Sequence, residues 1–192
     1  MKHTEISKTR GCWWKHLLLL WVAILGLAGS ASAGNYPFPQ NYQYKNGIIY
    51  TGSNVQSTLQ SLYTSWKSNY YVESGKYARI KFVQSGESGV NSVSEGIAYG
   101  MLVFVYMDNA TNSCQDEFDK LWNYYKFNSN GHGLMNWKVN AFTGQVTAPT
   151  SGNANGATDA DLDAAQALLM AHKQWGSSGT TNYLSEAKTL VN

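Results

Sequence analysis

Hydrophobic residues recur at helical spacing in several separate stretches of the 192-residue chain. The first begins at Val55, with Ser53 or Asn54 available as an N-cap. Its predicted buried face consists of Val55, Leu59, Leu62 and Trp66. The second, residues 94–107, is apolar nearly all round, which is typical of a buried helix. The residues that recur at helical spacing in it are Ile97, Met101, Leu102 and Val105.

Three more helices are predicted toward the C-terminus. One covers about 116–127, with an apolar stripe formed by Phe118, Leu121, Trp122 and Tyr125. The next runs from Thr158 to Trp175, and its predicted shared face consists of Leu162, Ala165, Leu169 and His172. The last covers about 182–191.

Polar segments rich in Gly, Ser and Asn separate these helices. We expect residues 36–50 to be irregular and residues 86–93 to form a loop. Residues 128–156 form a long predicted loop, and such loops in compact domains are usually functional or disordered. The pattern therefore predicts an all-α fold of successive helices joined by long loops.

The N-terminal segment has the features of a secretory signal peptide. Four basic residues precede an apolar run at 17–28, and Ala31-Ser32-Ala33 follows it. The run is shorter than the ~20 residues that span a bilayer, which disfavours the alternative of an uncleaved anchor. We expect cleavage after Ala33, a mature chain of residues 34–192, and a secreted or periplasmic protein without membrane attachment.

Cleavage would change the charge of the protein. Lys plus Arg falls from 14 to 10 and Asp plus Glu from 12 to 11, so the net charge becomes −1 instead of +2. The mature chain then lacks the basic surface that nucleic-acid binding requires. Cys12 would leave with the leader, and Cys114 would remain without an internal disulfide partner.

Two predicted helices begin with acidic residues directly after polar loops. Glu95 follows Ser94, and Asp159 and Asp161 follow Thr158. One interpretation is structural: Ser94 and Thr158 are natural N-caps, and acids stabilise the first turn of a helix. The other is catalytic, because most glycosidases use one carboxylic acid beside the leaving oxygen and a second carboxylate to activate water.

These segments also resemble glycoside hydrolase family 8. Residues 93–101 read VSEGIAYGM, residues 157–161 read ATDAD and continue to Ala171 and Trp175, and residues 133–137 between them read GLMNW. The resemblance runs from about Tyr36 to the end of the chain. One departure is Ala164, where the family usually has Ile or Met.

The resemblance implies an (α/α)6 toroid and hydrolysis with inversion of the anomeric configuration. It implies that Glu95 is the general acid and that Asp159 supports the distorted sugar ring at the cleaved bond. It also implies that Trp137 stacks on a sugar and that Tyr99 contacts substrate. Asp161 is a further candidate for substrate binding; otherwise it serves as a cap or supports the neighbouring acids.

The same resemblance predicts that the chain is incomplete. The family's general base lies beyond the second motif, so we expect it after Asn192, and Glu186 lies on an ordinary amphipathic helix. About five predicted helices make up roughly half of a twelve-helix toroid. We therefore expect the chain to be the N-terminal part of the catalytic domain and inactive as it stands.

The predicted function is endo-acting hydrolysis of a β-1,4-glucan by a protein that is monomeric when full length. Alternatives within the family are chitosan- and xylan-directed hydrolysis. A non-catalytic carbohydrate-binding protein is an alternative of a different class, consistent with 13 Tyr and 7 Trp residues, which also suit an aromatic core. No cofactor is expected, and His132 and His172 lack the partner spacing of a metal site.

Overall fold

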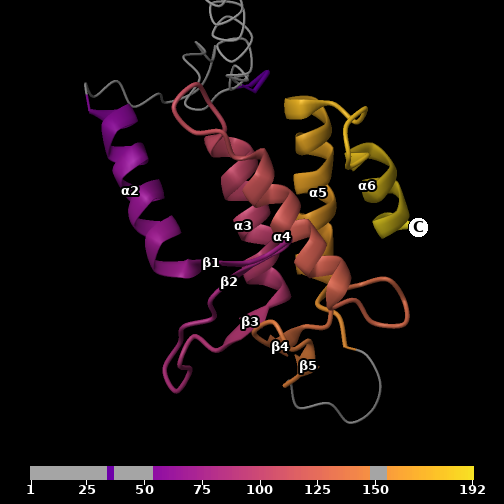
Figure 1. Cartoon of the computed structure of the whole chain (residues 1–192). Coiled ribbons are helices and arrows are strands. Elements are labelled where there is room, and N and C mark those ends of the chain that lie inside the picture. The colour runs from indigo at the N-terminus through magenta and orange to yellow at the C-terminus, as the bar shows by residue number, and fades with distance from the viewer. Residues whose placement is uncertain (1–33, 37–53, 148–154) are drawn as a thin grey trace, which may run out of the picture. The chain divides into compact units, whose positions relative to one another are not determined.

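Five helices and two small antiparallel sheets form the part of the chain that the computed structural model describes, residues 34–36, 54–147 and 155–192 (Figure 1). In chain order the elements are α2 (Val55–Tyr70), β1 (Tyr71–Ser74), β2 (Tyr77–Ile80), β3 (Asn91–Val93), α3 (Ser94–Met107), α4 (Gln115–Phe127), β4 (Lys138–Asn140), β5 (Gln145–Val146), α5 (Thr158–Trp175) and α6 (Tyr183–Val191). All these elements belong to one compact unit, Ser32–Asn192. The predicted signal peptide, residues 1–33, and most of the predicted irregular segment 36–50 lie outside the described residues.

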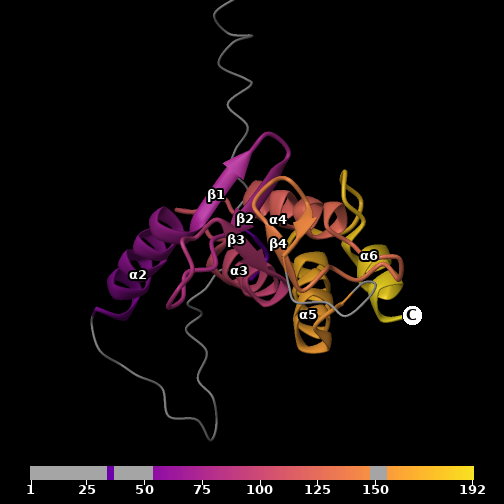
Figure 2. The same cartoon turned by 90° about the horizontal axis from the view of Figure 1, so that it is seen from below.

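The central helices are α3, α4 and α5. α3 packs against both α4 and α5, and α6 packs on the side of α5 that faces away from α3 (Figures 1 and 2). α3 and α5 start at the same end of the unit, whereas α4 runs in the opposite direction (Figure 1). The prediction that α3 and α5 lie side by side with both N-termini on one face is therefore confirmed.

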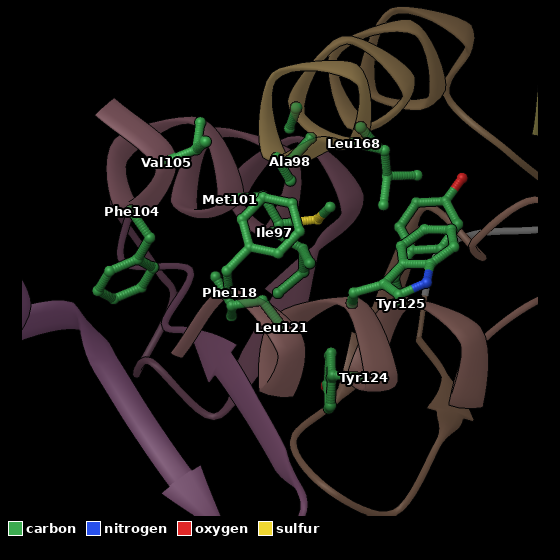
Figure 3. Packing of buried hydrophobic residues seen from close by; sticks show 14 of the residues in the cluster. Ile97, Ala98, Met101, Phe104, Val105, Phe118, Leu121, Tyr124, Tyr125 and Leu168 are labelled. Carbon is green, nitrogen blue, oxygen red and sulfur yellow. The ribbon is translucent and has the colours of Figure 1, made fainter. Parts of the chain in front are cut away.

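The core lies between these three helices and the β1–β2 hairpin. α3 contributes Ile97, Met101 and Phe104, and α4 contributes Phe118 and Leu121 (Figure 3). The Phe104 ring makes edge-to-face contacts with Tyr63, Trp66 and Tyr71, at centroid distances of 6.1, 5.6 and 5.1 Å. These rings connect α2 and β1 to α3, because such arrangements are favoured between aromatic rings.

The buried face of α5 differs from the predicted one. Leu162 and Leu169 are 62% and 43% exposed. The buried apolar side chains of this helix are small except for one leucine: Ala160, Ala164, Ala165, Ala167, Leu168 and Ala171. Small side chains allow helix axes to approach closely, and α5 packs against both α3 and α6. Ala164, a smaller residue than the resemblance led us to expect, is fully buried in the core.

The predicted face of α2 was also partly wrong. Leu62 is 62% exposed, and the buried residue of this helix is its neighbour Tyr63. The Tyr63 hydroxyl lies 3.3 Å from the buried sulfur of Cys114, the free cysteine of the described chain. Trp66 of the predicted face does pack on the core, and Tyr63 takes the inward position that was expected for Leu62.

The described part of the chain contains five short strands that the hydrophobic pattern did not predict. β1 and β2 form a hairpin in which Tyr71 lies opposite Ile80, with Gly75 in the turn at φ +59°. Residues 91–93, predicted as the end of a loop, are β3, and the predicted loop 128–156 contains β4 and β5. The sheet order is β3-β4-β5, and Val93 lies opposite Lys138. This pairing attaches the long segment to the start of α3, as the view in Figure 2 shows.

In the described ranges, no helix combines the length and hydropathy needed to cross a membrane.

Candidate active site

The two acidic helix starts are not capped in the predicted way. α3 has Val93 at its N-cap position and α5 has Ala157, both with extended backbone and neither with a side-chain capping hydrogen bond. Ser94 and Thr158 are therefore the first helical residues rather than caps. The Ser94 amide donates to the carbonyl oxygen of Trp137 at 2.8 Å, so the adjoining segment satisfies this helix end. The expectation that Ser94 and Thr158 cap these helices is therefore wrong, whereas Glu95, Asp159 and Asp161 do lie in first turns, where acids complement the helix dipole.

Glu95 is half-buried in the first turn of α3, and two neighbouring groups bind its carboxylate. The indole Nε1 of Trp137 donates to Oε1 at 2.9 Å, and the Ser94 hydroxyl donates to Oε2 at 3.3 Å. Trp137 is also half-buried, and its backbone amide donates to the carbonyl of Asn155 at 2.8 Å. Trp137 thus lies beside Glu95 and is partly exposed, as the sequence predicted.

Asp159 and Asp161 lie in the first turn of α5 but have different surroundings. Asp159 is exposed, whereas Asp161 is buried. Oδ1 of Asp161 accepts a short hydrogen bond from the Tyr125 hydroxyl, and its Oδ2 has no hydrogen-bond partner among the described residues. Asp161 is therefore neither a cap nor accessible to a polysaccharide.

Electrostatic interactions connect all three acids. Burial raises the pKa of the Asp161 carboxyl, and the charges of Asp159 and Glu95 raise it further, while the hydrogen bond from Tyr125 lowers it. Glu95 and Asp159, 64 positions apart in sequence, each lie in the first turn of a helix, and these two helices pack side by side and start at the same end of the unit (Figure 1). Together with Asp161 they place three carboxyl groups at the shared end of α3 and α5.

Tyr99 provides an aromatic surface on the same side of α3 as Glu95. It follows Glu95 by four residues, which places the two side chains on one helix face, and it is 54% exposed. Together with the partly exposed Trp137, it offers the flat apolar surface with a polar edge that sugar rings stack on.

The apolar pattern alone did not indicate the role of Tyr125. It was assigned only to the apolar stripe of α4, yet its hydroxyl is the hydrogen-bond donor to Asp161. A buried tyrosine usually needs a partner for its hydroxyl, and this rule could have indicated a polar group opposite α4. Gly156 is a second residue near Asp161 that the pattern did not indicate. A Cβ there would lie 3.3 Å from Oδ2 of Asp161, so a larger residue would crowd this carboxyl group.

The described residues contain no group of three or more His, Cys, Asp or Glu side chains placed to hold a metal ion. His132 is exposed, and Nδ1 of His172 lies 2.9 Å from the Ser177 hydroxyl at the end of α5. The side chains that this site does present are carboxyl groups beside partly exposed aromatic rings.

Comparison with known proteins gives matches over most of the chain. Residues 36–192 match the model of Glycosyl hydrolases family 8. A Beta-glucanase of Niallia circulans is 39% identical over 169 residues, which cover 84% of this chain and 39% of that protein. Endoglucanase A of Acetivibrio thermocellus is 37% identical over 183 residues, which cover 92% of this chain and 37% of that protein.

Solved structures give the same result. The apo structure of a Beta-1,3-1,4-glucanase from Paenibacillus sp. X4 has a TM-score of 0.69 and 38% identity, and the match covers 82% of this chain and 41% of that one. A reducing-end-xylose releasing exo-oligoxylanase, at 24% identity and a TM-score of 0.59, shares the fold. The chain spans about two fifths of the length of these relatives. Since the family has an (α/α)6 fold, the helices of this chain form one part of that fold. The chain belongs to glycosyl hydrolase family 8.

Proposed function

We propose that the chain supplies the acid-bearing part of the active site of a secreted, endo-acting glycoside hydrolase that cleaves β-1,4-glucan with inversion. The observation that carries this proposal is the group of carboxylates at the shared end of α3 and α5, beside the partly exposed Trp137. Relatives named endoglucanases and a beta-glucanase, with 35–39% identity, support a β-glucan as the substrate class.

Glu95 is the general acid in this proposal. It is half-buried, so a substrate can reach it, and the donors Trp137 and Ser94 restrict the position of its two oxygens. A general acid must be held within hydrogen-bond reach of the leaving oxygen, and this arrangement provides such restriction. Asp159, exposed at the start of α5, supports the distorted sugar, and Trp137 and Tyr99 bind sugar faces.

Asp161 has a supporting role. Its burial and its hydrogen bond with Tyr125 fix the first turn of α5, and with it the position of Asp159. Neither Asp161 nor Glu186 is suited to activate water, because Asp161 is buried and Glu186 forms an ion pair with Lys126 at 2.9 Å. The general base is therefore proposed to lie in the part of the family's catalytic domain that this chain does not span.

The proposal is tested by Glu95→Gln in the full-length protein. Gln has nearly the same shape and can still accept from Trp137, but it has no proton to donate to the leaving oxygen. General-acid assistance is worth ~10²–10⁴-fold, so turnover on soluble β-glucan should fall by that factor while the melting temperature changes little. Asp159→Asn should also lower turnover, because it removes the charge that faces the distorted sugar.

A matched control is Glu186→Gln, which changes an acid of the same type on a helix distant from Glu95 in sequence and should leave turnover intact. Full-length wild-type protein that binds β-glucan without hydrolysing it would favour the non-catalytic carbohydrate-binding alternative. Near wild-type turnover in Glu95→Gln, combined with a lower melting temperature, would show that Glu95 serves only the stability of the helix.

A further inference from the structure

A carboxylate without a visible counter-charge is buried at the end of α3. Asp108 is the C-cap residue of this helix and is 1% exposed. Its Oδ1 accepts the backbone N–H of Cys114 at 2.8 Å, but its Oδ2 has no hydrogen-bond partner and no ion pair within 34–36, 54–147 and 155–192. Burying a carboxylate is costly unless it is paired, so this oxygen needs a partner.

Gly34 lies directly against that oxygen. A Cβ at Gly34 would be 2.3 Å from Oδ2 of Asp108 and 2.6 Å from Cδ of Gln174, so only glycine fits this close approach. The contact thus places the backbone of the first described residue beside the unpaired carboxylate.

The residues that follow Gly34 are anchored by the buried side chain of Gln174. The Tyr36 amide donates to Oε1 of Gln174 at 2.6 Å, and Nε2 of Gln174 donates to the Tyr36 carbonyl at 3.2 Å. The Asn35 amide donates to the backbone carbonyl of Gln174 at 3.2 Å. Nε2 also donates to the carbonyl of Val105 at 3.2 Å, which connects this segment to α3. Gly34 is therefore held in place by a bonded segment.

The same place favours a positive charge for a second reason. α3 ends at Met107 and α5 ends at Trp175, and segment 34–36 contacts the residues at both ends. Helix C-termini carry partial negative charge and stabilise nearby cations. Two helix ends and a buried carboxylate thus converge on the backbone of Gly34.

We propose that cleavage after Ala33 creates a buried ion pair between the new α-ammonium group of Gly34 and Oδ2 of Asp108. Hydrolysis of the Ala33–Gly34 bond by a signal peptidase consumes one water, leaves a carboxylate on Ala33 and leaves an amine on Gly34. With an ordinary pKa of ~7.7–8.0, that amine takes up a proton at neutral pH and becomes a cation with three donors. Removal of the leader thereby completes the packing of this end of the fold. The inference rests on the proposed cleavage and not on the proposed hydrolytic activity.

A double-mutant cycle on full-length protein tests the pair. One form starts at Gly34, and the other starts at Ala31 and thus displaces the ammonium group by up to ~10 Å. Each form is made with Asp108 and with Asp108→Asn, which keeps the acceptor for Cys114. We expect Asp108→Asn to lower the melting temperature by about 3–8 °C in the form that starts at Gly34 and to lower it little or raise it in the longer form.

Two further measurements keep the test independent of stability. The mass of the secreted protein should correspond to a chain that begins at Gly34. Reductive methylation of the α-amine, followed by mass spectrometry of the N-terminal peptide, should be slower with Asp108 than with Asp108→Asn, whereas the exposed Asp116→Asn control should label like wild type. Additive effects in the cycle, equal labelling rates, or a mature N-terminus at another residue would each overturn the proposal.

Discussion

Glu95 and Asp161 lie at the same end of the unit but differ in what surrounds them. Glu95 accepts from an indole and a hydroxyl and is half-buried, whereas Asp161 accepts from a phenol and is buried. The first can meet a substrate, and the second can only support its neighbours. The two motifs identified both acids and implied that Glu95 is the general acid. They left the role of Asp161 open, because its partner Tyr125 comes from a helix outside the motifs.

Asp161 should make the stability of the protein depend on pH. Burial raises its pKa, so the folded protein binds more protons than the unfolded chain between the unfolded and folded pKa values. Stability from this group is therefore lost as the pH rises through that window. The melting temperature of Asp161→Asn relative to wild type should be higher at pH 7 than at pH 4. Tyr125→Phe removes the hydrogen bond that lowers this pKa, so it should increase the loss of stability between pH 4 and pH 7. A melting temperature of Asp161→Asn, relative to wild type, that does not change with pH would contradict the raised pKa of Asp161.

At the scale of secondary structure, long helices were predicted well and short strands were not. The prediction gave both ends of α3 and α5 correctly, because their period of three to four residues extends over at least 14 residues. β3, β4 and β5 have two or three residues each and take their stability from pairing across the sequence. The β1–β2 hairpin had a usable signal, the Gly75 turn between two Tyr-containing runs.

The buried face of a helix was harder to predict than its ends. Two of the leucines predicted to be buried in α5, Leu162 and Leu169, are exposed, whereas Leu168 and five alanines are buried. Periodicity reports which residues are apolar, whereas the distance between two helices decides which apolar residues fit. That distance is a property of the packed pair and cannot be read from either segment alone.

Two glycines of α3 should respond oppositely to the same substitution. A Cβ at Gly100 would lie 2.8 Å from Cγ1 of Ile80 and 2.9 Å from Cδ1 of Leu121, whereas at Gly96 the nearest atom, a Cγ2 of Val93, is 3.7 Å away. Replacing a helical Gly by Ala gains ~1 kcal/mol of helix propensity, but overpacking costs ~1–3 kcal/mol. Thermal unfolding should show a lower melting temperature for Gly100→Ala and an equal or higher one for Gly96→Ala. Equal stabilisation of both would mean that β2 and α4 do not pack closely on α3.

At the scale of the whole molecule, the described unit brings acids from two helix starts to one end, and a segment between them in sequence is hydrogen-bonded to one of them, Glu95. β3 pairs with β4, and Trp137 directly before β4 contacts both the Ser94 amide and the Glu95 carboxylate. The family assignment and the helical architecture could be predicted from the two motifs. The sheet that attaches Trp137 to Glu95 could not, because its partners are about 45 residues apart and each strand is too short to show a pattern.

The substrate should be a neutral glucan rather than chitosan. Chitosan is a polycation, and a cleft that selects it would be expected to present additional carboxylates along the chain of sugars. The sequence of residues 128–156, which includes Trp137, contains no Asp or Glu, and Lys138 within it pairs with Glu87. Initial rates of the full-length protein on soluble β-glucan should exceed those on chitosan and on xylan by at least about tenfold, which corresponds to ~1.4 kcal/mol of barrier.

The rate on β-glucan should also depend weakly on salt, because no attraction between opposite charges assists binding. A faster rate on chitosan that falls steeply with salt would show that acids outside the described residues dominate the cleft, and the substrate would then have to be reassigned while Glu95 kept its role.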